Sequence, residues 1–298
     1  MAQPSIAFLG IGLMGRPMAM RLLNAGFSLA AWNRTYAKAA SLPGATVATS
    51  PAAATAQADI VITMLAAGPI VGEVIEQILP ALRTDALVID MSSTRQAEAR
   101  ELHEKLAERG IGFVDAPVSG GVIGAEAGTL AIMAGGSSSD FARSVEVFNV
   151  LGRPTHVGGP GCGQLAKLCN QLIVGGTLNI IAEALLLAQA GGADPAAVRQ
   201  ALRGGFAESR ILEVHGQRML ERNFMPGGQV MSQAKDMENI LAAATSGSLH
   251  LPLTEVVKQL FDSLLTRVPH ADQSAALLAI ETLNPGLRLG VIPDQLPD

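Results

Sequence analysis

Short apolar runs alternate with amphipathic segments over about the first 160 residues of the chain. The runs have the length of strands, and some are apolar at almost every position, as in Ile60–Leu65. Continuous apolar strands are typical of a sheet that is covered on both faces. The predicted strands are Ile6–Leu9, Leu29–Trp32, Ile60–Leu65, Ala86–Asp90, Gly112–Asp115 and Leu130–Ala134. Helical segments such as Ile70–Leu82 and Arg95–Arg109 separate them, which predicts βαβ units and a largely parallel sheet.

From Gly161 onward no strand-like run recurs, and helical patterns follow one another. Asp194 and Pro195 have the types expected at a helix N-cap and at its first position. The predicted helices are Gly163–Ala190, Pro195–Gly204, Glu208–Glu221, Gln233–Thr245, Leu253–Arg267 and Gln273–Leu283. We therefore expect an α/β domain over residues 1–160, an all-helical domain over 161–284 reached through a long helix, and a loose tail over 285–298.

A glycine motif joins the first predicted strand to the first helix. Gly10, Gly12 and Gly15 form a GxGxxG pattern, with Leu13 and Met14 between the last two glycines. In this setting the glycines permit a tight turn, close approach of a pyrophosphate and close helix packing, while helix N–H groups face the phosphates. The alternative is an ordinary glycine-rich turn. The strand before it and the helix after it favour a Rossmann-fold dinucleotide site.

The residues after the second predicted strand indicate which dinucleotide binds. NAD-binding domains usually carry an acidic residue there, which holds the ribose 2′-hydroxyl. This chain has Asn33, Arg34 and Thr35 instead, so a 2′-phosphate meets a cation and a hydroxyl rather than a carboxylate. An exposed loop arginine is the plain alternative. We predict NADP(H) as the preferred cofactor, with NAD(H) possible.

Two further strand ends and one loop are candidates for the cofactor crevice. Met64 and Leu65 end one strand, and Thr94 follows another. Thr94 is predicted either to contact the ribose or nicotinamide or, like Ser93, to cap the following helix. The loop Ser119–Gly121 offers a hydroxyl and successive amides as a nest for a carboxylate, or else it only packs against the sheet.

The start of the long helix carries a lysine with two amides. Lys167, Asn170 and Gln171 are three and four residues apart, so a helix places them on one face. Such a face, turned into a cleft, suits polarisation of a carbonyl oxygen that becomes an alkoxide as hydride arrives. From spacing alone, a solvated surface lysine explains the pattern better.

Composition excludes several other classes of protein. The net charge of −5 and the absence of a basic run argue against a nucleic-acid surface. The five histidines lack ligand spacing, so no metal is expected. Two cysteines without a CxxC spacing and no evident signal peptide favour a reducing cytoplasm. Apolar helices in the second half need cover, which predicts a homodimer or homotetramer and no membrane partner.

Taken together, these motifs resemble the β-hydroxyacid dehydrogenase family, which includes the 3-hydroxyisobutyrate dehydrogenases. The resemblance runs from the Gly10–Gly15 loop through Asp115–Gly121 and Gly163–Asn170 to Lys235 and Asp236. It implies that Lys167 is the catalytic general acid. The other implied roles are a substrate carboxylate site at Ser119, Gly120 and Gly121, a substrate contact at Asn170 or Gln171, cofactor contacts at Met14, Leu65 and Thr94, and cofactor and substrate contacts at Lys235 beside Asp236.

Within that family, the segments Arg203–Ser209 and Arg222–Gly227 look most like those of tartronate semialdehyde reductases. The resemblance therefore implies NADPH-dependent reduction of a small carboxylate-bearing semialdehyde, with tartronate semialdehyde and D-glycerate as the favoured pair. The alternatives are a 3-hydroxyisobutyrate dehydrogenase or a broad glyoxylate or succinic semialdehyde reductase. A non-catalytic dinucleotide sensor is the alternative from another class, and the presence of Lys167 and Asn170 argues against it.

Overall fold

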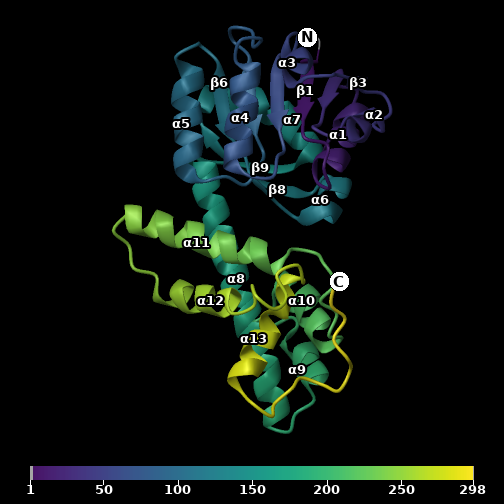
Figure 1. Cartoon of the computed structure of the whole chain (residues 1–298), viewed down its shortest axis with the longest axis vertical. Helices are drawn as coiled ribbons and strands as arrows, with labels where there is room; N and C mark the ends of the chain where they lie inside the picture. Colours follow the sequence, from purple (N-terminus) through teal and green to yellow (C-terminus); the bar gives the residue numbers. More distant parts are fainter. Residues whose placement is uncertain (1–2, 298) are drawn as a thin grey trace. The chain divides into compact units, whose positions relative to one another are not determined.

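The computed structural model describes residues 3–297 and divides into two compact units. The first unit ends at Lys167 and the second begins at Leu168. We expected the division near residue 160, before the long helix. It falls instead inside that helix, α8 (Cys162–Ala190), whose first turn packs with the sheet of the first unit (Figure 1).

The first unit contains a mixed sheet in the order β3-β2-β1-β4-β5-β6-β8-β7, with β9 also paired to β8. Pairing is parallel from β3 to β6 and between β8 and β9, whereas β6 and β7 run antiparallel to β8. The strands are β1 (Ile6–Leu9), β2 (Leu29–Trp32), β3 (Thr46–Val47), β4 (Ile60–Thr63), β5 (Leu87–Asp90), β6 (Gly112–Asp115), β7 (Val118–Ser119), β8 (Leu130–Gly136) and β9 (Gly152–Gly158). The Rossmann-fold prediction is confirmed.

Three strands were not predicted, and each lacks the apolar run that identifies the others. β3 and β7 are two residues long, too short to show a pattern. β9 is seven residues long, but all its side chains are partly or fully exposed, and it includes Arg153, Pro154 and His156. A strand at the edge of a sheet has no need of a continuous apolar sequence, so periodicity does not reveal it.

Helices cover both faces of this sheet, as the continuous apolar strands require. In β1, Ile6 and Phe8 pack into one core cluster, while Ala7 and Leu9 pack into another on the opposite face. The first cluster includes α1 and α7, and the second includes α3, α4 and α5. The helices of this unit are α1 (Gly15–Asn24), α2 (Tyr36–Ala40), α3 (Pro51–Thr55), α4 (Gly68–Ile78), α5 (Gln96–Ala107), α6 (Gly121–Ala127) and α7 (Ser138–Leu151).

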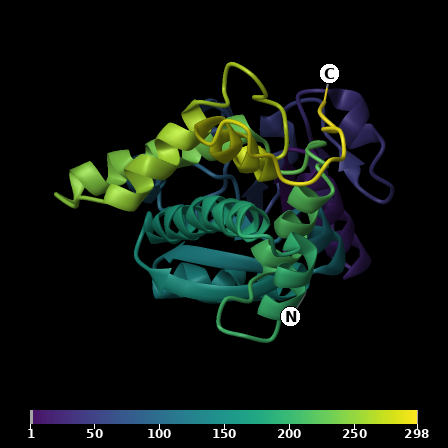
Figure 2. The ribbon, with the colours of Figure 1, turned by 90° about the horizontal axis from the view of Figure 1, so that it is seen from below.

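Helices alone make up the regular structure of the second unit within the described residues. They pack around a core that includes Leu185, Phe224, Phe261 and Leu277, and α11 lies beside α12 (Figures 1 and 2). The Asp194 carboxylate accepts from the Ala196 N–H, as expected of an N-cap. The elements are α8, α9 (Pro195–Leu202), α10 (Arg210–Leu220), α11 (Val230–Ser246), α12 (Pro252–Asp262), η1 (Gln273–Ala275) and α13 (Ala276–Leu283).

The segment after Asn284, which we expected to be loose, is mostly exposed but is bonded to its own unit at several points. Leu289 is 1% exposed, and the Gln295 backbone exchanges hydrogen bonds with Arg222 and Phe224. The buried Arg222 guanidinium is paired with Glu281 of α13 and with Asp294 of the tail. The composition of the segment predicted no regular structure, and ion pairs and backbone bonds hold it in place without any.

By length and composition alone, α8 is the one helix among the described residues that could cross a membrane. Its most apolar window has a mean hydropathy of 1.7 and is 39% buried in the structure. A core helix of a folded unit passes the same test, and Asn179, Glu183 and Gln189 interrupt this one. Leu178, Ala182 and Leu185 of α8 pack into the core of the second unit, as predicted for a packed helix.

Candidate functional site

The glycine loop leaves room for a ligand at one of its three glycines. Gly10 has φ +111°, and a Cβ added there would lie 2.2 Å from the Met64 carbonyl oxygen. A Cβ on Gly15 would lie 1.9 Å from the Gly10 oxygen. The fold itself therefore requires both. A Cβ on Gly12 would meet nothing within 4 Å, so the protein's own packing does not explain this glycine. Close approach of a pyrophosphate does explain it.

The N-terminus of α1 stands open beside this loop. Met14 is at the N-cap position, and no side chain caps the helix there. Leu13 is 85% exposed. Free N–H groups at a helix N-terminus attract anions, and side chains usually satisfy them where no ligand does. The loop, the open helix end and the space at Gly12 together fit the pyrophosphate of a dinucleotide.

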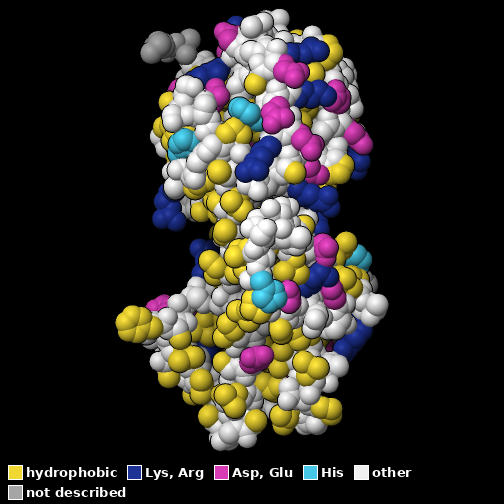
Figure 3. Space-filling view, turned by 90° about the vertical axis from the view of Figure 1, so that its left-hand side faces the viewer, with side chains coloured by type: hydrophobic (Ala, Val, Ile, Leu, Met, Phe, Trp, Pro, Cys, Tyr) yellow, Lys and Arg dark blue, Asp and Glu magenta, His cyan; other side chains and the backbone are white. Residues whose placement is uncertain are grey.

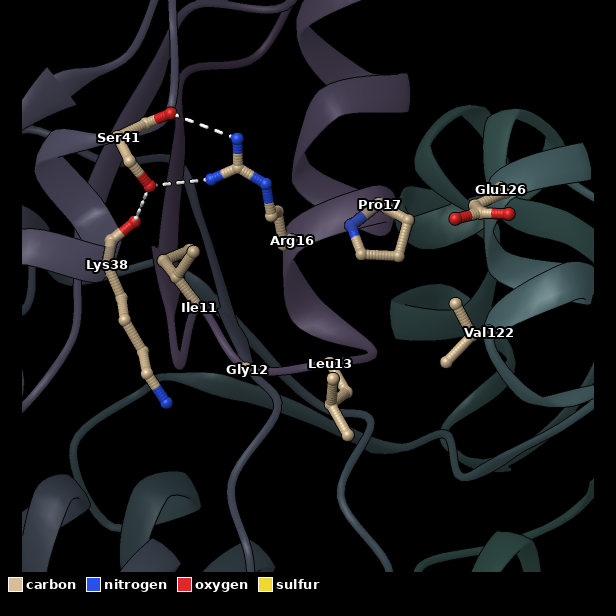
Figure 4. Close-up of a pocket in the computed structure, with 9 residues that line it drawn as sticks. All are labelled: Ile11, Gly12, Leu13, Arg16, Pro17, Lys38, Ser41, Val122 and Glu126. Carbon is tan, nitrogen blue, oxygen red and sulfur yellow. Dashed lines mark hydrogen bonds between the residues drawn. The ribbon is translucent and has the colours of Figure 1, made fainter. Parts of the chain in front are cut away.

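An open groove of about 430 Å³ lies along the loop in the first unit. Figure 4 shows Lys38 on one side of it and Pro17 and Val122 on the other. Arg16 also lines the groove, but its guanidinium is turned to Ser41, with a distance of 2.6 Å between Nη1 and Oγ. Lys38 is exposed and leaves one side of the groove positively charged.

The loop after β2 is tied to the glycine loop by a side chain. Asn33 accepts from the Ile11 N–H at 3.0 Å and donates to the Thr35 carbonyl at 3.0 Å, so its amide fixes both loops. Arg34 is exposed, and its guanidinium has no hydrogen bond or ion pair within residues 3–297. Sequence reasoning missed Lys38, four residues after Arg34. It lies in α2, a five-residue helix that the apolar pattern does not predict, so no signal in the sequence identifies it.

The carboxyl ends of β4 and β5 meet, as a parallel ladder requires, and the structure excludes one of the two alternatives for Thr94, the helix cap. The Leu65 N–H donates to the Ser92 hydroxyl at 2.9 Å. Helix α5 is capped at Arg95, so neither Ser93 nor Thr94 caps it. The Thr94 hydroxyl is buried and has no hydrogen-bond partner within the described part of the chain. A buried hydroxyl without a partner calls for an explanation, and a contact with a bound ligand is one.

The predicted carboxylate nest lies at the start of α6. Ser119 ends β7, and the next two residues have φ +139° and +62°, which only glycine adopts readily. Gly120 and Gly121 are both exposed, and the Ser119 side chain has no hydrogen bond to the rest of residues 3–297. The loop therefore presents small residues and a hydroxyl to solvent, as a carboxylate site needs.

The N-terminus of α8, which carries Lys167, is seated on the sheet by Asp115. The two Asp115 carboxylate oxygens accept from the Gly161 and Gln164 N–H groups, each at 2.8 Å. A Cβ on Gly163 would lie 2.2 Å from the Asp115 carbonyl oxygen, so the approach is closer than any other residue allows. Burial raises the pKa of Asp115 to about 7, although both hydrogen bonds act to lower it. Lys167 is half-buried in the following turn.

Asp90, at the end of β5, makes stability depend on pH. Burial raises its pKa from 3.8 to about 6, against hydrogen bonds from Ser92 and Thr63. The protonated folded form is favoured, so this contribution is complete below pH 3.8 and is lost as pH rises through about 6. The difference corresponds to about 3 kcal/mol. In urea titrations, Asp90→Asn should therefore gain stability relative to wild type between pH 4 and pH 7. A constant difference across that range would contradict the assignment.

The second unit holds a short chain of polar side chains between α8 and α11. Asn170 donates to the Gln171 side-chain oxygen at 2.8 Å, and Gln171 donates to the Asp236 carboxylate at 2.6 Å. Gln233 donates to the Gln171 backbone oxygen at 3.1 Å. Lys235 is 49% exposed, with Nζ 3.8 Å from Asp236. The side chain of Gln171 is thus held on both sides by its neighbours.

Comparisons with known proteins match the two parts of the chain to successive family models. Residues 5–162 match the NAD-binding domain of 6-phosphogluconate dehydrogenase, and residues 161–280 match the NAD-binding domain of NADP-dependent 3-hydroxyisobutyrate dehydrogenase. The fold and the glycine loop thus define a Rossmann-fold NAD(P)-dependent oxidoreductase.

Individual relatives agree with these models over nearly the whole chain. The chain is 40% identical to 2-hydroxy-3-oxopropionate reductase of Escherichia coli over 93% of its own length and 97% of the relative. It is 34% identical to a probable mitochondrial 3-hydroxyisobutyrate dehydrogenase-like protein of Arabidopsis thaliana, covering 94% and 86%. A solved structure of Mycobacterium tuberculosis 3-hydroxyisobutyrate dehydrogenase with L-serine matches with a TM-score of 0.86 and 30% identity, covering 94% and 99%. The chain belongs to the 3-hydroxyisobutyrate dehydrogenase-like family of β-hydroxyacid dehydrogenases.

Proposed function

We propose that this protein reduces tartronate semialdehyde to D-glycerate with NADPH as the hydride donor. The main support for this substrate is the similarity to 2-hydroxy-3-oxopropionate reductase, at 40% identity over 97% of that enzyme. Tartronate semialdehyde is another name for 2-hydroxy-3-oxopropionate. The M. tuberculosis relative was solved with L-serine, a small 3-hydroxy carboxylate like glycerate. Both comparisons favour a small substrate with a carboxylate and an oxygen on the third carbon.

Cofactor preference is proposed from the charges around the β2 loop. Asn33 places an uncharged side chain where an acid would repel a 2′-phosphate, and Arg34 and Lys38 are exposed cations on either side of Thr35. A phosphate in this region gains charge-assisted hydrogen bonds, which are about twice as strong as neutral ones. A 2′-hydroxyl gains much less. We therefore assign NADP(H) as the preferred cofactor, with NAD(H) as the weaker one.

The chemistry needs one proton donor and one anchor from the chain. We assign Lys167 as the general acid, which donates a proton from Nζ to the carbonyl oxygen of the substrate. The bound nicotinamide supplies the hydride. Ser119, Gly120 and Gly121 hold the substrate carboxylate through the hydroxyl and backbone N–H groups, so that the aldehyde is presented in one orientation. Thr94 offers its unpartnered hydroxyl to the nicotinamide or ribose.

The hydrogen bonds of the second unit favour one of the two amides as the substrate contact. Gln171 is occupied by Asp236 and by Asn170, whereas the Asn170 oxygen is not used in any of these bonds. We assign Asn170 to the substrate hydroxyl or carbonyl, and Gln171 to holding the Asn170 amide in place. Lys235 remains the assigned contact to cofactor and substrate beside Asp236.

A substrate panel tests this proposal. Initial rates of NADPH oxidation are measured with tartronate semialdehyde, glyoxylate and succinic semialdehyde, and NADP⁺ reduction is measured with 3-hydroxyisobutyrate. We expect the highest kcat/KM for tartronate semialdehyde. A higher value for 3-hydroxyisobutyrate or for succinic semialdehyde would favour the corresponding alternative. Cofactor binding without turnover of any of them would favour a dinucleotide sensor.

Self-association is proposed from an exposed apolar stripe on α8. Ile173, Ile180 and Leu187 recur every seven residues and are 63%, 55% and 73% exposed. Figure 3 shows hydrophobic side chains gathered over much of one face of the helical unit. Repeated apolar residues at this spacing are typical of a helix–helix seam. Light scattering should give at least a dimer for wild type and a smaller species for Ile180→Glu. A monomeric wild type would contradict the proposal.

A further inference from the structure

Gln164 is a buried polar residue of the first unit to which neither the motifs nor the comparisons assign a role. It lies in the first turn of α8, three residues before Lys167, and its side chain is 0% exposed. A helix places residues three apart on the same face. The Gln164 side chain therefore leaves the helix on the side from which Lys167 extends one turn later.

Both ends of the Gln164 amide are bonded to the loop that carries Thr94. Its oxygen accepts from the Thr94 N–H at 3.1 Å, and its nitrogen donates to the Ser92 carbonyl at 2.8 Å. The Gln164 side chain therefore accepts one hydrogen bond and donates the other. A glutamine amide can do both, whereas an ionised carboxylate can only accept and a lysine or arginine can only donate. We call Gln164 with its bonds to Ser92 and Thr94 the Gln164 clamp.

The clamp is part of a longer buried network at the carboxyl ends of the strands. Ser92 donates its N–H to Asp90 at 3.1 Å and accepts through its hydroxyl from Leu65 at 2.9 Å. On the other side, the Gln164 N–H is held by Asp115 at 2.8 Å. Direct hydrogen bonds thus join the first turn of α8 to Ser92 and Thr94, and through Ser92 to Leu65.

We propose that Gln164 is a positioning residue that fixes Lys167 relative to the Thr94 loop through the Gln164 clamp. This inference rests on the proposed function, because it concerns the distance between the general acid and the reacting carbonyl. Misplacement of a reacting group by about 1 Å can cost roughly 10²-fold in rate. The clamp fixes the first turn of α8 relative to the Thr94 loop, which we assign to the cofactor. Asp115 and Gly163 fix the same turn relative to the sheet.

Two variants separate positioning from simple support of the fold. Gln164→Met has nearly the same shape but makes neither bond, so kcat should fall by roughly 10–100-fold at every pH. Gln164→Glu makes both bonds only when the introduced carboxylic acid is protonated, because its hydroxyl can then donate to the Ser92 carbonyl. Burial beside Asp115 favours that protonated form. Its kcat should approach wild type at low pH and fall as pH rises, with an ionisation that wild type lacks.

The measurements are kcat and KM from pH 5 to 9, the Kd for NADPH from fluorescence titration, and hydrogen exchange at the Thr94 amide. Gln259→Glu adds a carboxylate at an exposed position of α12 and serves as the control for added charge. We expect the kcat losses to exceed any change in Kd, and we expect faster exchange at Thr94 in Gln164→Met. Thermal unfolding of every variant gives the folded fraction.

Three results would overturn the inference. These are a Gln164→Met kcat within about twofold of wild type, pH profiles of the two variants that coincide, and a loss that follows the unfolded fraction alone. If wild type reduces no aldehyde of the panel, the proposed function fails separately. Hydrogen exchange then decides the clamp: unchanged exchange at Thr94 in Gln164→Met refutes it, and faster exchange supports it.

Discussion

Replacing Lys167 by alanine is expected to lower kcat for aldehyde reduction by roughly 10²–10⁴-fold, the usual contribution of a positioned general acid. The alkoxide that forms as hydride arrives then lacks a proton donor. NADPH affinity should change little, since we assign the phosphates to the glycine loop and the β2 loop and not to Lys167. Steady-state kinetics with saturating NADPH and a parallel fluorescence titration measure the two effects separately.

Lys167→Arg is the matched control for charge. A guanidinium keeps the positive charge but does not give up its proton under ordinary conditions, so it can attract the carboxylate without acting as an acid. We expect Lys167→Arg to resemble the alanine variant in kcat and wild type in substrate KM. Near wild-type turnover in the alanine variant would remove Lys167 from the chemistry.

The double variant Arg34→Ala/Lys38→Ala is expected to weaken NADPH binding by roughly 10²-fold or more while leaving NADH binding nearly unchanged. Each cation offers the 2′-phosphate a charge-assisted bond of about 1.5–3 kcal/mol, and about 1.4 kcal/mol corresponds to a factor of ten in Kd. NADH carries no phosphate at that position. Isothermal titration with each cofactor gives both values on the same preparation.

The single variants and a distant arginine complete this experiment. Arg34→Ala and Lys38→Ala should each show part of the loss, and Arg109→Ala, exposed at the end of α5, should show none. Because phosphate contacts are screened by salt, the NADPH preference of wild type should also decline as ionic strength rises. A wild-type preference for NADH would contradict the assignment of the β2 loop.

The pattern of apolar residues predicted most of the fold because buried parallel strands need continuous apolar sequence. β1, β2 and β6 occupy the predicted ranges, and α8 begins one residue before its prediction. Strands that are short or lie at the sheet edge, such as β7 and β9, have no such requirement and were missed. The contacts of the tail after Asn284 were not foreseen, because ion pairs rather than a periodic apolar face make them.

The sequence predicted those parts of the candidate site in which the fold or the cofactor requires a particular residue type at a fixed distance along the chain. Gly10, Gly15 and the missing acid after β2 are features of this kind. Lys38 and Gln164 were not predictable, because their importance depends on which loops the fold brings next to them. The sequence shows Gln164 only as a polar residue near a helix start. Its bonds to Ser92 and Thr94 join segments 72 and 70 residues apart.

Hydride transfer itself is the most direct test of the account. Tartronate semialdehyde is incubated with the protein and NADPH deuterated at C4 of the nicotinamide, and the product is analysed by mass spectrometry and chiral chromatography. We predict D-glycerate with one deuterium on its third carbon, formed at a rate that Lys167→Ala reduces by roughly 10²-fold or more. Unlabelled aldehyde recovered intact, while the cofactor is bound, would contradict the assignment of this protein as a tartronate semialdehyde reductase.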